Sequence, residues 1–79
     1  MKLNKIFSSH MVFPAHKTTS VYGEGKGKAT VTFNGIAKEF LSEADAWRIE
    51  FPPMEYGGPY TMEIDLDGEK TVLDDIYIG

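Results

Sequence analysis

The feature that most constrains the fold of this chain is a series of short runs in which apolar and polar residues alternate. A turn signal ends each run. In "KATVTF", Ala29, Val31 and Phe33 alternate with polar residues, and "AWRIEF" places Trp47 and Ile49 on one face. A period of two is typical of a β-strand with one buried face. Because no apolar i, i+3, i+4, i+7 pattern persists for three helical turns, the sequence predicts an all-β fold.

Turn residues indicate how these strands connect. Asn34-Gly35 tolerates the positive φ angles of a type I′ turn, so residues 36–40 should return antiparallel to the strand that ends at Phe33. Pro52-Pro53 should end the strand that contains Trp47, because proline lacks the N–H that a ladder needs. The sequence therefore predicts a hairpin around Asn34-Gly35 and a break after Phe51.

The break at residues 52–59 precedes a second long alternating run. Gly57-Gly58-Pro59 predicts a sharp reversal of the chain. Asp67-Gly68 predicts the next turn, as a three-residue loop with Gly68 in the left-handed region. With a loop of that odd length, a set of apolar residues after the turn would face the core together with the inner residues before it. The inner residues before the turn are Tyr60, Met62, Ile64 and Leu66, and those after it are Val72, Ile76 and Ile78.

The remaining segments complete one small domain. "KLNKIF", "HMVF" and "TTSVYGEG" are short extended candidates, and the helix-like patch at residues 41–47 is short enough to be a turn. A chain of 79 residues has room for a single core. We therefore predict that residues 1–79 form one small antiparallel two-sheet β-sandwich of the immunoglobulin-like kind, with about seven short strands.

Charge and composition exclude several classes of protein. The net charge of −4 is spread over scattered acids, which predicts no nucleic-acid partner. There is no cysteine for disulfides or thiol chemistry, and no apolar run approaches the roughly 18 residues of a membrane-spanning helix. "MKLNKIF" lacks the apolar stretch of a signal peptide. As written, the chain is expected to be cytoplasmic, with no membrane partner and no cofactor.

One acidic segment has the spacing of a calcium-binding loop. "EIDLDGEKTVLD" puts Glu63, Asp65, Asp67, Gly68 and Asp74 at positions 1, 3, 5, 6 and 12 of an EF-hand-like loop. However, the first position is Glu, the last is Asp rather than a bidentate Glu, and both flanks alternate as strands. A turn at Asp67-Gly68 with solvent-facing acids explains the pattern, so we predict no metal site.

Other residues that could carry chemistry have ordinary structural interpretations. His10 and His16 flank a proline-containing break and have no carboxylate or thiol close by in sequence, which is typical of structural or surface histidines. "GEGKGKAT" leads into a strand rather than a helix, so it reads as a turn and not a phosphate-binding loop. The serines Ser8, Ser9, Ser20 and Ser42 occupy no nucleophile elbow. We therefore predict no catalytic residue in this chain.

Taken together, the motifs resemble those of the N-terminal domain of sialate O-acetylesterases. In that family an F-S-x-H-M-V segment precedes a V-T-V-x-F hairpin, a G-x-W strand and a P-P-x-x-x-G-G-P-Y turn. Phe13-Pro14 stands where the family has L-Q, and Tyr22 where it often has Trp. The matching residues are Phe7, Ser8, His10, Met11, Val12, Gly23, Val31, Phe33, Trp47, Pro52, Pro53, Gly57, Gly58, Pro59, Tyr60 and Gly79.

The resemblance implies a non-catalytic accessory domain. In the family, the nucleophilic serine lies in an S-G-Q-S-N segment that follows the position matching Gly79, and this motif is absent from the sequence. The implied partner is a hydrolase domain of the same parent chain, which removes O-acetyl groups from sialic acids or related sugars with a serine, histidine and aspartate site. The resemblance leaves a secreted or periplasmic parent open.

A carbohydrate-binding module is the alternative. Such a module stacks sugars on exposed aromatic rings, and Tyr22, Tyr56 and Tyr77 are the candidates once the in-phase aromatics, Trp47 included, are assigned to the core. The same three tyrosines are candidates for contacts between domains. Whether they share one exposed face would distinguish the two functions.

Overall fold

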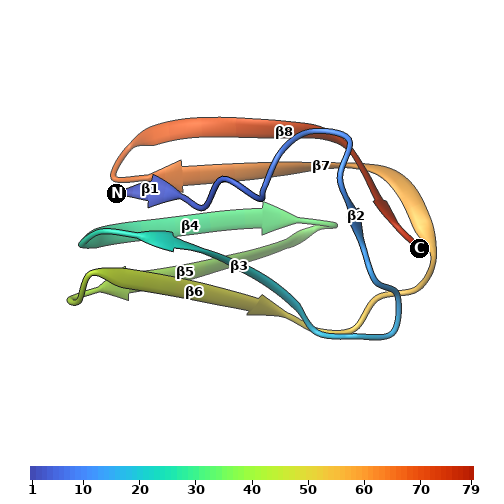
Figure 1. Cartoon of the computed structure of the whole chain (residues 1–79), viewed down its shortest axis with the longest axis horizontal. Coiled ribbons are helices and arrows are strands. Elements are labelled where there is room, and N and C mark those ends of the chain that lie inside the picture. Colours follow the sequence, from blue (N-terminus) through green and yellow to red (C-terminus); the bar gives the residue numbers. More distant parts are fainter.

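A computed structural model of residues 1–79 confirms the all-β sandwich. Its strands are β1 (Lys2–Leu3), β2 (Val12–Phe13), β3 (Thr19–Glu24), β4 (Gly27–Phe33), β5 (Ile36–Ser42), β6 (Ala46–Phe51), β7 (Gly57–Leu66) and β8 (Glu69–Ile78). They form a three-stranded sheet, β1-β3-β6, and a five-stranded sheet, β2-β8-β7-β4-β5 (Figure 1). There are thus eight strands rather than about seven, and β7 and β8 are ten residues long rather than short. The structure has no helix that could cross a membrane.

The N-terminal segment contributes to both sheets. β1 pairs antiparallel with β3, whereas β2 pairs parallel with β8, so the prediction of a purely antiparallel sandwich was wrong at this edge. Between the two strands the chain crosses from one sheet to the other. There the buried ring of Phe7 packs against Phe13 and Tyr22, with centroid distances of 6.4 and 5.0 Å. Phe7 thereby closes the edge of the sandwich.

The core lies between the two sheets and follows the predicted alternation. Trp47 is 2% exposed, which confirms its predicted place on the inner face. The largest fully buried side chains are Trp47, Phe33, Phe51, Met62, Ile64, Ile76, Val21 and Val31. These residues come from five strands, so burial of their apolar surface joins the sheets into one body.

Two of the predicted turns are present. Phe33 pairs with Ile36 across a two-residue loop in which Asn34 and Gly35 have φ angles of 49° and 77°, as a type I′ hairpin requires. The turn predicted for residues 41–47 is confirmed but shorter, because β5 continues to Ser42 and β6 begins at Ala46. The buried Ser42 hydroxyl lies 3.0 Å from the Ala46 carbonyl oxygen, to which it donates a hydrogen bond.

The loop between β7 and β8 is shorter than predicted. Leu66 pairs with Glu69 across two residues, and Asp67 as well as Gly68 has a positive φ angle, 52° and 90°. The three-residue loop was therefore wrong. The predicted inward position of Val72 was wrong for the same reason, since Val72 pairs with the outer residue Glu63 and is 45% exposed.

A bulge in β8 turns Ile76 and Ile78 toward the core, which the two-residue loop alone does not do. Met62 pairs with Leu73 and Tyr60 with Ile76, so two residues of β8 oppose one of β7. Asp75, in this bulge, has a φ angle of 53°. Ile76 and Ile78 therefore point inward as predicted, but because of a bulge rather than an odd loop.

A second irregularity lies where the sequence predicted a sharp reversal. Gly57-Gly58-Pro59 is the beginning of β7, and Gly57 pairs with Ile78 while Tyr60 pairs with Ile76. Here the extra residue belongs to β7, so it offsets the extra residue of β8. The chain changes sheet earlier, in residues 52–56, and the predicted reversal at Gly57-Gly58-Pro59 was wrong.

β5 forms one edge of the five-stranded sheet, with β4 as its hydrogen-bonded neighbour. Lys38 pairs with the fully buried Val31 and therefore lies on the inner side of the strand. Glu39 lies on the outer side, where its carboxylate is 3.5 Å from the ammonium of Lys28. The edge strand thus carries a charge on each face.

Candidate functional site

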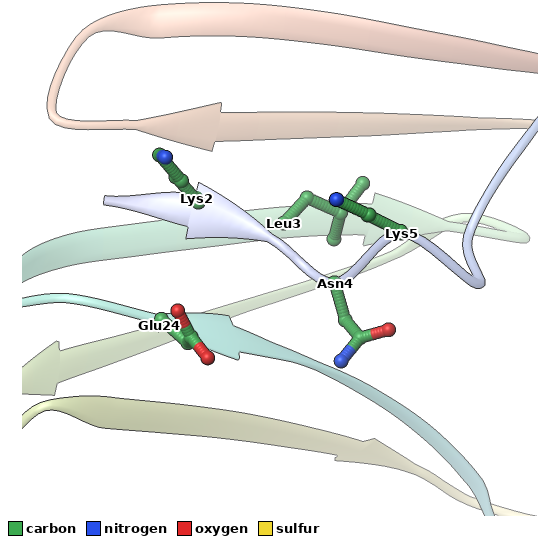
Figure 2. Close-up of a pocket in the computed structure, with 5 residues that line it drawn as sticks. All are labelled: Lys2, Leu3, Asn4, Lys5 and Glu24. Carbon is green, nitrogen blue, oxygen red and sulfur yellow. The ribbon is translucent and has the colours of Figure 1, made fainter.

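Two hollows lie on the three-stranded sheet. The first has a volume of about 410 Å³ and is lined by Lys2, Leu3, Asn4, Lys5 and Glu24. In Figure 2, Asn4 on the segment after β1 and Glu24 on β3 project toward the same side of the sheet. This hollow is polar, with two lysines and one carboxylate, and its residues come from β1, the segment that follows it, and the end of β3.

The second hollow lies beside the first along β3. It has a volume of about 310 Å³ and is lined by Tyr22, Gly23, Ala46, Trp47 and Arg48. Tyr22 and Arg48 are direct partners in the β3–β6 ladder, and both alternate with buried residues, so they face outward. The small residues Gly23 and Ala46 and the indole of Trp47 complete the lining.

The Tyr22 ring is engaged by protein groups on two sides. The guanidinium carbon of Arg48 lies 5.5 Å from the ring centroid, within the range of a cation–π contact. Phe7 meets the ring at an interplanar angle of 80°. Tyr22 is half-buried and packs against the core, so it has a clear structural role on the outer face.

One of the lining residues, Trp47, carries an unsatisfied donor. The indole Nε1 of Trp47 is buried and has no hydrogen-bond partner. Leaving such a donor unpaired costs about 1 to 3 kcal/mol. Trp47 is therefore held by its packing in the core and not by a polar contact.

The three candidate tyrosines do not share one exposed face. Tyr22 lies on the outer face of the three-stranded sheet, and Tyr77, paired with Val12, lies on the outer face of the five-stranded sheet. Tyr56 is 70% exposed in the loop between β6 and β7, where its ring meets His16 edge-on at 5.2 Å. No continuous aromatic platform joins them.

Each histidine has a carboxylate neighbour that sequence reasoning missed. His16 Nε2 lies 2.8 Å from Glu55 Oε2, and His10 Nδ1 lies 3.1 Å from Asp75 Oδ2. All four side chains are exposed. His16 and Glu55 are 39 residues apart in sequence, so the pairing follows from the packing of distant loops, which no local pattern signals.

Two of the serines, Ser9 and Ser42, are hydrogen-bonded to the backbone. The Ser9 hydroxyl accepts a hydrogen bond of 3.0 Å from the Asp74 N–H, and Ser42 donates to the carbonyls of Ala44 and Ala46. No hydrogen bond joins a serine to His10 or His16. These serines and histidines therefore do not form the nucleophile and base pair of a serine hydrolase.

The acidic segment forms a turn. Asp67 Oδ1 accepts a hydrogen bond of 2.9 Å from the Lys28 N–H, and Asp65 Oδ1 accepts one of 2.8 Å from the Gly68 N–H. The structure contains no group of three or more metal-ligating side chains. The carboxylates thus stabilise the hairpin, as the turn interpretation predicts.

Comparisons with known proteins bear on the fold. No protein-family model and no curated protein matches the chain. Among solved structures, a carbohydrate acetylesterase from Xanthomonas citri matches 99% of this chain with a TM-score of 0.90 and 22% sequence identity. The chain spans only 19% of the length of that protein. The domain therefore has the fold of one small part of a carbohydrate acetylesterase.

Proposed function

We propose that this domain is a non-catalytic accessory domain of a carbohydrate esterase and packs against the hydrolase domain of the same parent protein. The observation that carries the proposal is the backbone match, which takes in the whole sandwich at a TM-score of 0.90 and only 19% of the acetylesterase. The N-terminal position follows from the sequence resemblance to sialate O-acetylesterases.

The side chains support the non-catalytic part of the proposal. Ester hydrolysis by the serine mechanism needs a nucleophile within hydrogen-bond reach of a base. Here the histidines contact Glu55 and Asp75, while the hydroxyls of Ser9 and Ser42 bond to backbone groups. In our proposal, the reactive groups belong to the hydrolase domain.

For the substrate, we propose O-acetyl groups on sialic acids or related sugars. Two independent likenesses support this choice. The sequence motifs resemble sialate O-acetylesterases, and the solved structure with the same fold is a carbohydrate acetylesterase.

We further propose that the sandwich is immunoglobulin-like. In immunoglobulin domains, strands B and E are neighbours in one sheet and strands C, F and G in the other. Here β3 neighbours β6, and β4, β7 and β8 are consecutive in the second sheet, which supports this description.

An activity assay tests the function. The 79-residue chain should release no acetate from p-nitrophenyl acetate or from acetylated sialic acids above the rate of a heat-killed sample, whereas the parent protein should hydrolyse the sugar ester. Turnover by the isolated chain that is lost on His16→Ala or Ser9→Ala would contradict the non-catalytic role.

The carbohydrate-binding module remains the second candidate, because one hollow places a guanidinium and a phenol side by side at Tyr22 and Arg48. Titration of the labelled chain with acetylated and free sialic acid, followed by NMR, separates the two candidates. Saturable shifts at β3 and β6 would favour sugar binding, and unchanged spectra are expected for an accessory domain.

A further inference from the structure

We propose that an apolar patch at the end of β8 is the surface on which the hydrolase domain docks. The patch consists of the side chains of Val12 and Tyr77 and the backbone of Gly58, and is called the Tyr77 patch below. This inference rests on the proposed function and adds to it the place of contact.

The patch extends across three adjacent strands. Val12 of β2 and Tyr77 of β8 are direct partners in the parallel ladder, and they are 60% and 46% exposed. Their sequence neighbours Phe13 and Ile78 are buried in the core. Val12 and Tyr77 therefore lie side by side on the outer face of the five-stranded sheet.

Gly58 of β7 supports the tyrosine ring. A Cβ atom at Gly58 would lie only 2.6 Å from Tyr77 Cδ1 and 3.1 Å from Tyr77 Cα, so the side chain rests directly on the glycine backbone. A large aromatic side chain that is already held in place loses little freedom when a partner binds, which favours binding.

Two ion pairs lie elsewhere on this outer face. Lys70 and Glu63 lie 3.8 Å apart, and Lys28 and Glu39 lie 3.5 Å apart, whereas the Tyr77 patch contains no charged side chain. The centres of protein interfaces are depleted in charge and enriched in tyrosine, with a polar rim around them. The His10 and Asp75 pair, two residues from Tyr77 along β8, fits such a rim.

The position of Gly79 indicates that a hydrolase domain covers the Tyr77 patch. The Cβ position of Gly79 is 4.0 Å from Val12 Cγ1, and Figure 1 shows the C-terminus beside β2 and far from the N-terminus. A hydrolase domain that follows Gly79 would start at the patch. Its tethering would give it a high effective concentration there, so a modest apolar contact would suffice.

Hydroxyl-radical footprinting with mass spectrometry tests this surface. Oxidation of each side chain is compared between the 79-residue chain and the full-length parent protein. We expect Tyr77 to be oxidised in the isolated chain and protected several-fold in the parent. Leu41, which is 68% exposed on β5, should be oxidised equally in both.

Matched variants of the parent protein complete the test. Tyr77→Lys should speed proteolytic cleavage between the domains, whereas Val72→Lys, on the same strand and face with nearly the same exposure, should not. Circular dichroism of the isolated variants checks that both remain folded.

The outcomes separate the two proposals. Protection of Tyr22 or Leu41 instead of Tyr77 would overturn the docking surface and leave the accessory role intact. If no side chain of this domain were protected in the parent, the packing of the domain on a hydrolase domain would itself be wrong, and the docking surface with it.

Discussion

Gly23 on β3 leaves no room for a side chain beneath the indole ring of Trp47 on β6. A Cβ atom at Gly23 would come within 2.7 Å of Trp47 Cζ2, and it would also overlap the carbonyl oxygen of Lys2. Both neighbours belong to strands that pair with β3. The glycine therefore sets how closely Trp47 and β1 approach the central strand.

Gly23→Ala should destabilise the domain by about 1 to 3 kcal/mol, the usual cost of overpacking a core. The measurement is urea denaturation followed by circular dichroism. Gly79→Ala is the control, because the Cβ position there meets only Val12 at an ordinary contact distance. Equal midpoints for the two variants would show that the sheet adjusts without strain.

Trp47→Ala should cost about 3 to 5 kcal/mol, because it removes a fully buried ring and leaves a cavity. The whole stability of a small domain is about 5 kcal/mol at the low end, so much of the population should unfold. Tyr56→Ala, at a side chain that is 70% exposed, should cost little. If Trp47→Ala instead kept a near-native midpoint in the same denaturation experiment, its ring would not be part of the core.

Deletion of Asp75 should leave a cooperative unfolding transition. With the extra residue of β8 gone, Leu73, Asp74 and Ile76 alternate regularly, so Ile76 and Ile78 still point inward. Asp75→Asn should also remain folded, since asparagine adopts a positive φ angle, whereas Asp75→Val should melt at a lower temperature, because a β-branched residue is strained there. Thermal melts of the variants give the comparison, and loss of the cooperative transition in the deletion would contradict the role given to the bulge.

Asp67→Ala should destabilise the β7–β8 hairpin by about 1 to 2 kcal/mol, since alanine is strained at a positive φ angle. It also removes the carboxylate that accepts the Lys28 N–H. Asp67→Asn keeps an acceptor and tolerates the turn geometry, so its midpoint should stay close to that of the parent chain. A loss as large for asparagine as for alanine would indicate that the negative charge, rather than the turn, is what matters.

Calcium should leave the melting temperature unchanged, because Asp65 and Asp67 already accept backbone hydrogen bonds. Specific binding at a hundredfold excess over the dissociation constant would add about 2.7 kcal/mol of stability. Thermal melts with calcium and with a chelator make the comparison. A calcium-dependent rise that Asp67→Asn removed would restore the metal-loop interpretation.

Most of the fold could be predicted because its signals are local. Alternation identified the inner residues of β4 and β6, and Asn34-Gly35 specified its turn by backbone preference alone. The two bulges could not be predicted in this way. Each adds one residue to one of two paired strands, so the position of Ile76 depends on how β7 and β8 align and not on a short sequence.

The candidate site was less predictable than the fold. The three tyrosines could be named as non-core residues, but their distribution over different faces depends on which sheet each strand joins. The His16 and Glu55 contact likewise joins loops that are distant in sequence. The type of a side chain indicates which contacts it can make. Which residues lie beside it depends on how the strands are arranged in the two sheets.

Lys38, on the inner side of β5, disfavours aggregation of the domain through this edge in concentrated solution. An exposed edge strand is a template for strand addition by another chain, which leads to aggregation. A strand added beside β5 would have to cover the Lys38 ammonium on one face and the Glu39 carboxylate on the other, and a charge that loses water without a partner is costly. This edge is thus protected against polymerisation, which matters for a small domain while its chain is still being synthesised and its final contacts have not yet formed.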